Sequence, residues 1–123
     1  MTRAVLDQLG AACAEAVAVV LLRDDGVPVE LIDRSHGLEG VGGRPNALGP
    51  QLAGVLAEVR RTAQVLEYGA VEEIAVSSDR LTLLVRAVGL RHYLALVLAP
   101  GARVGRGRFL LRLYGSRLGM ALA

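Results

Sequence analysis

Cysteine and histidine are among the side chains that could carry nucleophilic, acid–base or metal chemistry, and this sequence has only Cys13, His36 and His92. A thiol nucleophile needs a neighbouring base, and a catalytic zinc ion normally takes three protein ligands. Cys13 lies in an alanine-rich run, where a free cysteine packs as a small hydrophobic residue. His36 falls in a polar loop and His92 at the start of a predicted strand. We therefore expect no catalytic residue, no metal ion and no cofactor.

A glycine-rich segment, residues 37–44, could cradle a phosphate group with its backbone N–H groups. It lacks the Lys-Ser/Thr ending of a nucleotide-binding loop and the spacing of the dinucleotide fingerprint, and the sequence contains no lysine at all. The segment is therefore interpreted as a plain connection.

Two pairs of adjacent carboxylates, Asp24-Asp25 and Glu72-Glu73, could be mistaken for acid–base pairs. Successive side chains of a strand point to opposite faces, so neither pair brings its two carboxylates together. We expect both pairs to be solvated. With no catalytic constellation left, the sequence favours a binding or scaffolding module over an enzyme.

Charge is distributed unevenly along the 123 residues. Residues 1–79 hold all 12 acids and six of the arginines, a net charge of −6, whereas residues 80–123 hold eight arginines and no acid. Such a split indicates either a basic contact surface or two halves that attract each other. The eight arginines are spread over several elements without interleaved aromatic residues, which favours solvated faces. A partner-protein surface is the second interpretation, and a surface for nucleic acid or anionic lipid is the third.

The length fits one domain spanning residues 1–123. A single cysteine cannot form an internal disulfide and fits a reducing cytoplasm. The longest apolar run, residues 16–22, is far shorter than the roughly 20 residues of a membrane-spanning helix, and the N-terminus does not resemble a secretory signal. We expect a cytoplasmic protein.

The first third of the chain predicts a helix followed by a hairpin. Residues 2–12 have helical spacing, and residues 16–22 form a continuous β-branched run typical of a strand buried on both faces. Asp-Gly at 25–26 favours a tight turn into a second strand, 27–32. Pro28 cannot donate a ladder hydrogen bond, which places that second strand at a sheet edge.

A helix of about 20 residues follows a polar loop at 33–45 and ends at Gly69, with Pro50 tolerated in its first turn. Its apolar residues recur at steps of three and four and predict one buried stripe. That stripe consists of Leu48, Leu52, Val55, Leu56, Val59, Ala63 and Leu66.

The last third predicts three strands, 71–76, 81–88 and 92–98, joined by hairpin-sized turns as an antiparallel meander. Residues 103–122 form a closing helix. Its inward side chains are predicted to be Phe109, Leu110, Leu113, Tyr114 and Leu118, with Arg108, Arg112, Gly115 and Gly119 on its other side.

The predicted order is α-β-β-α-β-β-β-α. A single five-stranded antiparallel sheet covered by helices, an α+β fold, satisfies this order.

The element order and several local patterns resemble the roadblock / dynein light chain family, including its bacterial MglB-like members. The matching parts cover nearly the whole chain: the helix ending at Leu9-Gly10, the strand and turn of residues 18–26, the long helix 48–66, the strand–turn–strand 73–83 and the strand end 96–101. The resemblance implies a roadblock-like, profilin-like fold.

The resemblance also implies a homodimer. In this family the strand after the long helix pairs with its two-fold mate, flanked by packing of the long helices. Carried over, the pairing edge would contain Val71, Glu73, Ala75 and Ser77. A free apolar strand edge is a liability that such pairing removes.

Family members regulate or tether small Ras-like GTPases, and MglB-like ones activate a GTPase. The resemblance therefore implies a non-catalytic homodimeric regulator or scaffold of such a GTPase. The outward face of the long helix is the first candidate for contact with the GTPase or with the mate. This face consists of Gln51, Gly54, Glu58, Arg61 and Val65.

Two other classes of function stay open. A small-molecule sensor or structural dimerisation module would share the predicted architecture, although a sensor needs a pocket with converging polar groups. A nucleic-acid-binding protein would show an affinity that falls steeply with salt.

Overall fold

The computed structural model describes residues 1–34 and 45–122, with the side chains of residues 45–47 left out. The glycine-rich segment 37–44 and His36 therefore lie outside the described residues. The elements run in the order α1 (Thr2–Ala12), β1 (Ala16–Arg23), β2 (Pro28–Asp33), α2 (Pro45–Val65), β3 (Glu73–Ser77), β4 (Thr82–Val88), β5 (His92–Leu98) and α3 (Val104–Leu122). This is the predicted α+β order.

The five strands form one sheet in the order β2-β1-β5-β4-β3, and every neighbouring pair is antiparallel. The central strand β5 joins the first hairpin to the later strands. Because β2 ends the sheet, the edge position predicted from Pro28 is confirmed. The other edge is β3.

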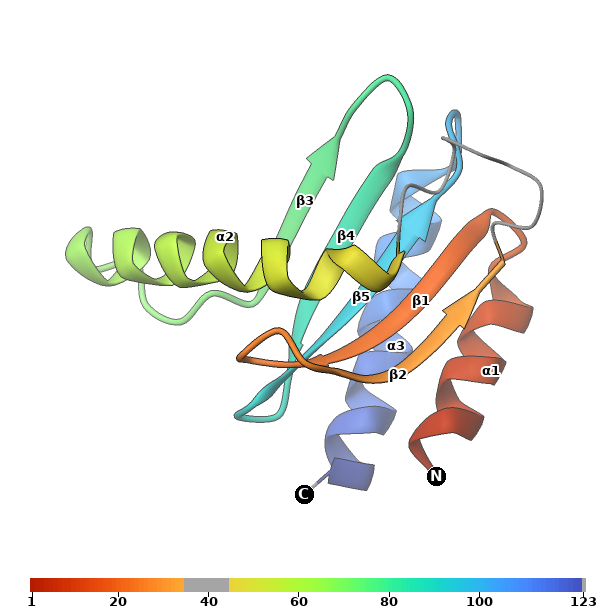
Figure 1. The fold of residues 1–123 in the computed structure, drawn as a ribbon, viewed down its shortest axis with the longest axis horizontal. Helices are drawn as coiled ribbons and strands as arrows, with labels where there is room; N and C mark the ends of the chain where they lie inside the picture. The colour runs from red at the N-terminus through yellow and green to blue at the C-terminus, as the bar shows by residue number, and fades with distance from the viewer. Residues whose placement is uncertain (35–44, 123) are drawn as a thin grey trace.

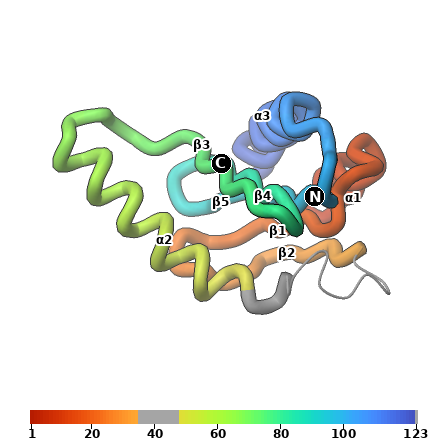
Figure 2. Tube along the Cα trace, turned by 90° about the horizontal axis from the view of Figure 1, so that it is seen from above, coloured from red at the N-terminus to blue at the C-terminus, as the bar shows by residue number. Residues whose placement is uncertain are grey.

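Helices cover both faces of the sheet (Figures 1 and 2). α1 and α3 lie side by side on one face, and α2 crosses the other. The central strands are buried on both sides: all of β1 except Arg23 is buried, as its continuous apolar run predicts. No helix in the described part of the chain is long and apolar enough to cross a membrane.

The larger core cluster lies between the sheet and the α1–α3 layer. Its helical members include Leu6 and Leu9 from α1 and Leu110, Leu111 and Leu118 from α3. The smaller cluster lies under α2, where Leu52 and Leu56 pack against residues of β1, β4 and β5. The sheet is therefore sealed more thoroughly on its α1–α3 face.

The first turn of α2 touches the hairpin turn between β1 and β2 backbone to backbone. Gly26 has a positive φ of 89°, and a Cβ atom on Gly49 would fall on the carbonyl oxygen of Gly26. Only glycine at both positions permits this approach. The contact fixes where α2 enters its face of the sheet.

The closing helix faces the core partly as predicted: Leu110 and Leu118 are buried, and Tyr114 packs against the core. The prediction is wrong for Phe109, which is 61% exposed, and for Leu113, which is also exposed, whereas Leu111 and Gly115 are buried instead. The apolar residues of α3 cover two sides of the helix, so periodicity alone could not separate the buried side from the exposed one. Gly107 also faces the sheet, because a Cβ there would lie 2.9 Å from Leu98 Cδ1.

Candidate functional site

The outer edge of β3 is open in the described chain. β3 pairs with β4 from Glu73 opposite Arg86 to Ser77 opposite Thr82, and it has no strand on its other side. It begins two residues later than predicted, so Val71 precedes it in irregular structure. An unpaired strand edge offers a row of backbone donors and acceptors to another strand.

Side chains of β3 alternate between the two faces of the sheet. Ile74 packs under α2, and Val76, two residues on, shares its side and is exposed. Ala75 and Ser77 are exposed on the opposite side. The open edge therefore combines small, polar and apolar side chains and carries no proline.

Glu73 is not solvated, which corrects the expectation for the Glu72-Glu73 pair. Its side chain is 11% exposed and its Oε2 lies 2.6 Å from Arg108 Nη2 of α3. Its Oε1 is buried without a hydrogen bond and lies 3.8 Å from Arg86 Nη1. Two arginines of the acid-free second half thus hold the first residue of β3 against the α3 face.

The opposite edge of the sheet is protected. β2 begins with Pro28, and α1 packs beside it, with Arg3 donating to the carbonyl oxygen of Leu31 and lying 3.6 Å from Glu30. Proline and charged side chains both discourage strand addition. Of the two edges, β3 is the one available for pairing.

The second half of α2 extends past the sheet (Figures 1 and 2). A helix of 21 residues is about 32 Å long, whereas five strands with four spacings of about 4.8 Å span only about 19 Å. The helix is therefore too long for the sheet it crosses. Leu52 and Leu56 are buried, but beyond them only Ala63 is.

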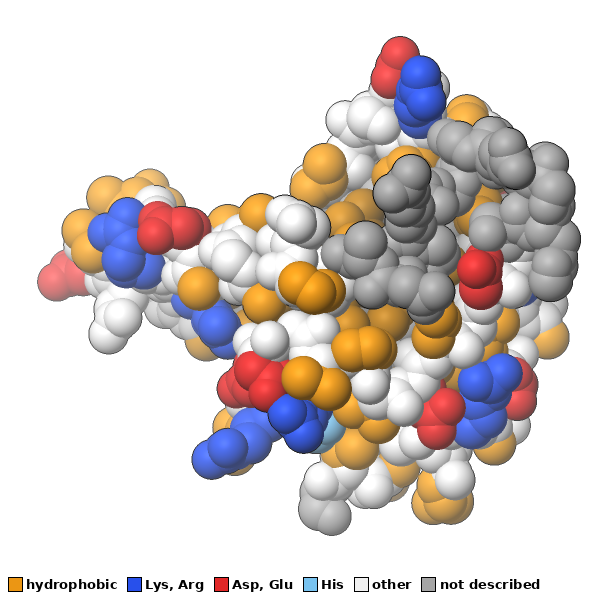
Figure 3. All heavy atoms as spheres, in the orientation of Figure 1, with side chains coloured by type: hydrophobic (Ala, Val, Ile, Leu, Met, Phe, Trp, Pro, Cys, Tyr) orange, Lys and Arg blue, Asp and Glu red, His pale blue; other side chains and the backbone are white. Residues whose placement is uncertain are grey.

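Apolar side chains are left exposed where α2 leaves the sheet. Val65 is 69% exposed and Tyr68 79%, and Val55 and Leu66 are each about half exposed. In Figure 3 this part of α2 forms a lobe at the left, with apolar side chains beside a few charged ones. The predicted buried stripe is therefore wrong for Val55 and Leu66. We call the set Val55, Val65, Leu66, Tyr68 and Val76, together with the free edge of β3, the α2–β3 surface.

One contact supports the projecting part of α2. Arg60 Nη1 donates to Tyr93 Oη at 2.7 Å, and the guanidinium lies 5.6 Å from the ring centroid. A hollow of about 640 Å³ remains between α2, residues 67–71 and the β4–β5 turn. Arg60 and Tyr93, which line this hollow, already hydrogen-bond to each other.

The predicted partner-facing residues of α2 all lie at the surface. Gln51, Gly54, Glu58, Arg61 and Val65 are exposed, and Arg61 Nη2 lies 2.9 Å from Glu58 Oε2. What sequence reasoning missed is the exposure of the apolar residues Leu66 and Tyr68, which directly follow the helix. The length of the predicted helix could have indicated this exposure, because the helix is longer than a five-stranded sheet is wide.

The described residues contain no group of three or more histidine, cysteine or acidic side chains that could hold a metal ion. Cys13 is buried, and His92 begins β5 as predicted.

Similar proteins are found by structure alone: no protein-family model matches the chain, and no curated protein matches it in sequence. The gliding protein MglB of Thermus thermophilus superposes with a TM-score of 0.82 at 20% identity, covering 97% of this chain and 86% of that one. An MglB with a tetrameric arrangement gives 0.83 at 19% identity, covering 97% and 85%.

The likeness extends to other members of the fold. A roadblock/LC7 domain from Streptomyces avermitilis gives a TM-score of 0.79 at 16% identity, covering 96% of this chain and 94% of that one. Profilin IA of Acanthamoeba castellanii gives 0.61 at 14% identity over the whole of both chains. The expected resemblance is thus confirmed at the level of the fold. This chain has the roadblock-like, profilin-like fold that MglB and roadblock/LC7 proteins share.

Proposed function

We propose that the chain is a self-associating, non-catalytic regulator or scaffold of a small Ras-like GTPase. The observation that carries the proposal is the α2–β3 surface: an open strand edge beside a helix whose apolar side chains extend beyond the sheet. Two copies would pair along β3, with Val71, Glu73, Ala75 and Ser77 at or next to the edge. The projecting ends of α2 would then find apolar partners.

Two further observations support self-association. The competing edge, β2, is blocked by Pro28 and by α1, so strand addition has one site. An MglB of the same fold has a tetrameric arrangement, which makes assembly a property known within this fold. In the pairing proposed here, the ion pair with Arg108 orders the Glu73 side chain, while the backbone of Glu73 lies at the pairing edge.

The GTPase is proposed from the resemblance to MglB-like proteins, one of which is a gliding protein. The outward side of α2, from Gln51 through Glu58 to Val65, is the proposed contact. It is exposed along its length and combines charged, polar and apolar side chains, as the rim and core of a transient interface do.

Self-association is tested by light scattering coupled to size exclusion. The double substitution Val65→Asp with Leu66→Asp places two charges on the α2–β3 surface and should weaken the dimer by about a hundredfold or more. Val27→Asp, at an apolar position that is 45% exposed beside the protected β2 edge, is the control and should leave the dimer intact. A wild-type monomer at tens of micromolar, or equal effects of both variants, would refute the pairing.

Regulation is tested separately by calorimetric titration of the chain against the small Ras-like GTPases of its source organism, loaded with GDP or a GTP analogue. We expect binding that Glu58→Ala with Arg61→Ala weakens without changing the dimer. Absence of binding in both nucleotide states would remove the GTPase and leave a structural dimerisation module.

A further inference from the structure

The closing helix α3 carries an apolar stripe that the core does not use. Leu110, Leu111 and Leu118 face the sheet, whereas Phe109, Leu113 and Met120 are exposed, Met120 to 80%. Phe109, Leu113 and Met120 recur at steps of four and seven, so they share one side of the helix. A helix that needs one apolar stripe to fold has a second one available for binding.

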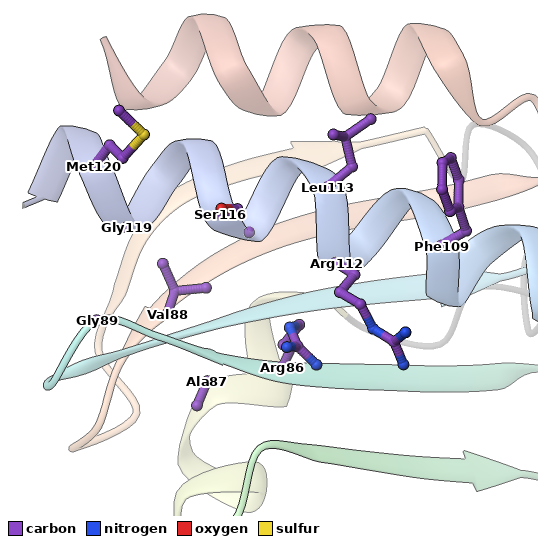
Figure 4. Close-up of a pocket in the computed structure, with 11 residues that line it drawn as sticks. Arg86, Ala87, Val88, Gly89, Phe109, Arg112, Leu113, Ser116, Gly119 and Met120 are labelled. Carbon is purple, nitrogen blue, oxygen red and sulfur yellow. The ribbon is translucent and has the colours of Figure 1, made fainter.

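This second stripe borders a groove of about 710 Å³ between α3 and the end of β4. Figure 4 shows Phe109, Leu113 and Met120 along α3, with Arg86 and Val88 on β4 below them. Because α3 lines it, the groove lies on the face of the sheet that α1 and α3 cover, which is opposite α2 (Figure 2). It is therefore separate from the α2–β3 surface, and its volume lies in the range of ligand-binding clefts.

Two glycines of α3 leave the groove open. A Cβ atom on Gly115 would come no closer than 3.7 Å to Arg86 or Val88, and one on Gly119 no closer than 3.9 Å to Gly89. Packing against the sheet therefore does not demand glycine at either position. Each glycine weakens the helix relative to alanine, so the fold would be served as well by alanine at both positions. What the two glycines provide is open space in the groove that they line.

The groove is positively charged. Arg86 and Arg112 line it, and the acid that pairs with Arg86, Glu73, is also held by Arg108. Arg112 makes no hydrogen bond or ion pair within the part of the chain that the structure describes. No acid follows Asp79 in the sequence, so α3 and β4 supply no countercharge.

We propose that this groove binds an acidic peptide segment of a partner protein that also carries apolar side chains. Its carboxylates would pair with Arg112 and Arg86, and its apolar side chains would pack on Phe109, Leu113 and Met120. The stripe from Phe109 to Met120 is about 16 Å long, which matches roughly five residues of extended peptide. This goes beyond the proposed function, because it lies on the other face of the sheet.

The recessed position of Arg86 favours a peptide over an anionic membrane as the occupant. Arg86 lies at the floor of the groove with a side chain only 23% exposed. A flat bilayer surface contacts protruding side chains, whereas a peptide can insert a carboxylate between α3 and β4. Membrane binding is accordingly kept as an outcome that the experiment can return.

The test is a selection from a random twelve-residue peptide library displayed on phage, with the full chain immobilised. Two variants block the groove: Arg112→Glu reverses the free charge, and Gly119→Leu fills the space. Each has a matched control elsewhere, Arg80→Glu in the β3–β4 turn and Gly105→Leu in the first turn of α3, where a Cβ meets nothing within 4 Å. Selected peptides are then synthesised, and their affinities are measured by fluorescence anisotropy.

We expect enrichment of peptides that combine acidic and bulky apolar residues. Arg112→Glu and Gly119→Leu should each weaken their binding about tenfold or more, and the two controls should not. Thermal unfolding and light scattering should show that all four variants keep the wild-type fold and assembly. Affinity should fall as salt rises.

Three results would overturn the inference. They are no enrichment over an empty surface, enriched peptides without net negative charge, and affinities that the groove variants leave unchanged. Cosedimentation with phosphatidylserine-containing vesicles that Arg112→Glu abolishes, without any peptide selected, would assign the groove to a membrane instead. None of these results bears on self-association through β3, so the two proposals fail independently.

Discussion

The two faces of the sheet are covered by helices of similar length, but α3 is packed against the sheet along its length and α2 is not. α3, with 19 residues, lies on the sheet beside α1 and buries leucines along its length. α2, with 21 residues, crosses the other face and buries leucines only in its first half. On one face the helix packs against the sheet along its length, whereas on the other face the second half of the helix extends past the sheet.

The difference shows that an apolar stripe is not by itself evidence of burial. α3 is held by close approach, since Gly107 lets it sit against Leu98, and by the Arg108–Glu73 ion pair. α2 is held at its start by Gly26 and Gly49 and in its second half by Arg60. What extends beyond these anchors is available to another molecule.

The largest expected effect contrasts one leucine from each face. Leu111→Ala, in the α3 core, should lower the free energy of unfolding by about 2–5 kcal/mol, whereas Leu66→Ala at the projecting end of α2 should change it by no more than about 0.5 kcal/mol. Urea unfolding measures both, at a protein concentration low enough to suppress self-association, which would otherwise stabilise the folded state. Equal losses would mean that α2 is packed along its whole length.

A second contrast lies within α2. Gly49→Ala places a Cβ against the backbone of Gly26 and should cost about 1–3 kcal/mol. Gly54→Ala, with nothing within 4 Å of its Cβ, should instead gain about 0.5–1 kcal/mol from helix propensity. Thermal unfolding distinguishes the signs. A gain at both positions would show that the turn does not anchor the helix.

A third contrast compares one ion pair from each face. Glu73→Gln removes the charge held by Arg108 and Arg86 and should cost about 1–2 kcal/mol, because the carboxylate is mostly buried although Arg108 is half exposed. Glu58→Gln removes an exposed pair on α2 and should cost about 0.3–0.5 kcal/mol. Urea unfolding at low and high salt measures both, and the Glu58 effect should vanish first. A larger loss at Glu58 would contradict the comparison.

The smallest effect concerns the turn that anchors α2. Hydrogen bonds from Arg23 and from the backbone N–H of Val27 hold the pKa of Asp25 below its ordinary value. A carboxyl with a lowered folded-state pKa stabilises the fold above the pKa it has when unfolded, roughly pH 4, and loses that contribution as pH falls through its folded-state pKa. Asp25→Asn should therefore be slightly less stable than wild type at neutral pH and equal to it in strong acid. Unfolding curves that diverge on acidification would refute this.

Much of the fold could be read from local patterns. Alternation, turn residues and Pro28 placed all eight elements in order and put β2 at an edge, because these signals depend on neighbours in sequence. The inward side of α3 could not be read in the same way, since Phe109 and Leu113 are as apolar as Leu110 and Leu111. The pairing of Glu73 with α3 was equally hidden, because its partner Arg108 lies 35 residues further along the chain.

The candidate sites also divide into a part that local sequence predicted and a part that depends on the tertiary structure. The outward residues of α2, such as Gln51 and Glu58, are polar at helical spacing, and their exposure was predicted from periodicity. The exposed end of α2 and the groove beside α3 were not, because each depends on how much sheet lies beneath a helix.

The charge split is the clearest case of what each level decides. The sequence by itself determined that one half is acidic and the other wholly basic, and that the chain alternates helices and strands in one order. The tertiary structure decided that Arg103 meets Glu15 and that Arg108 meets Glu73, while Arg112 is left beside an open groove. The physical reason is distance: charges and apolar side chains act over a few ångströms, and only the fold sets which residues come that close.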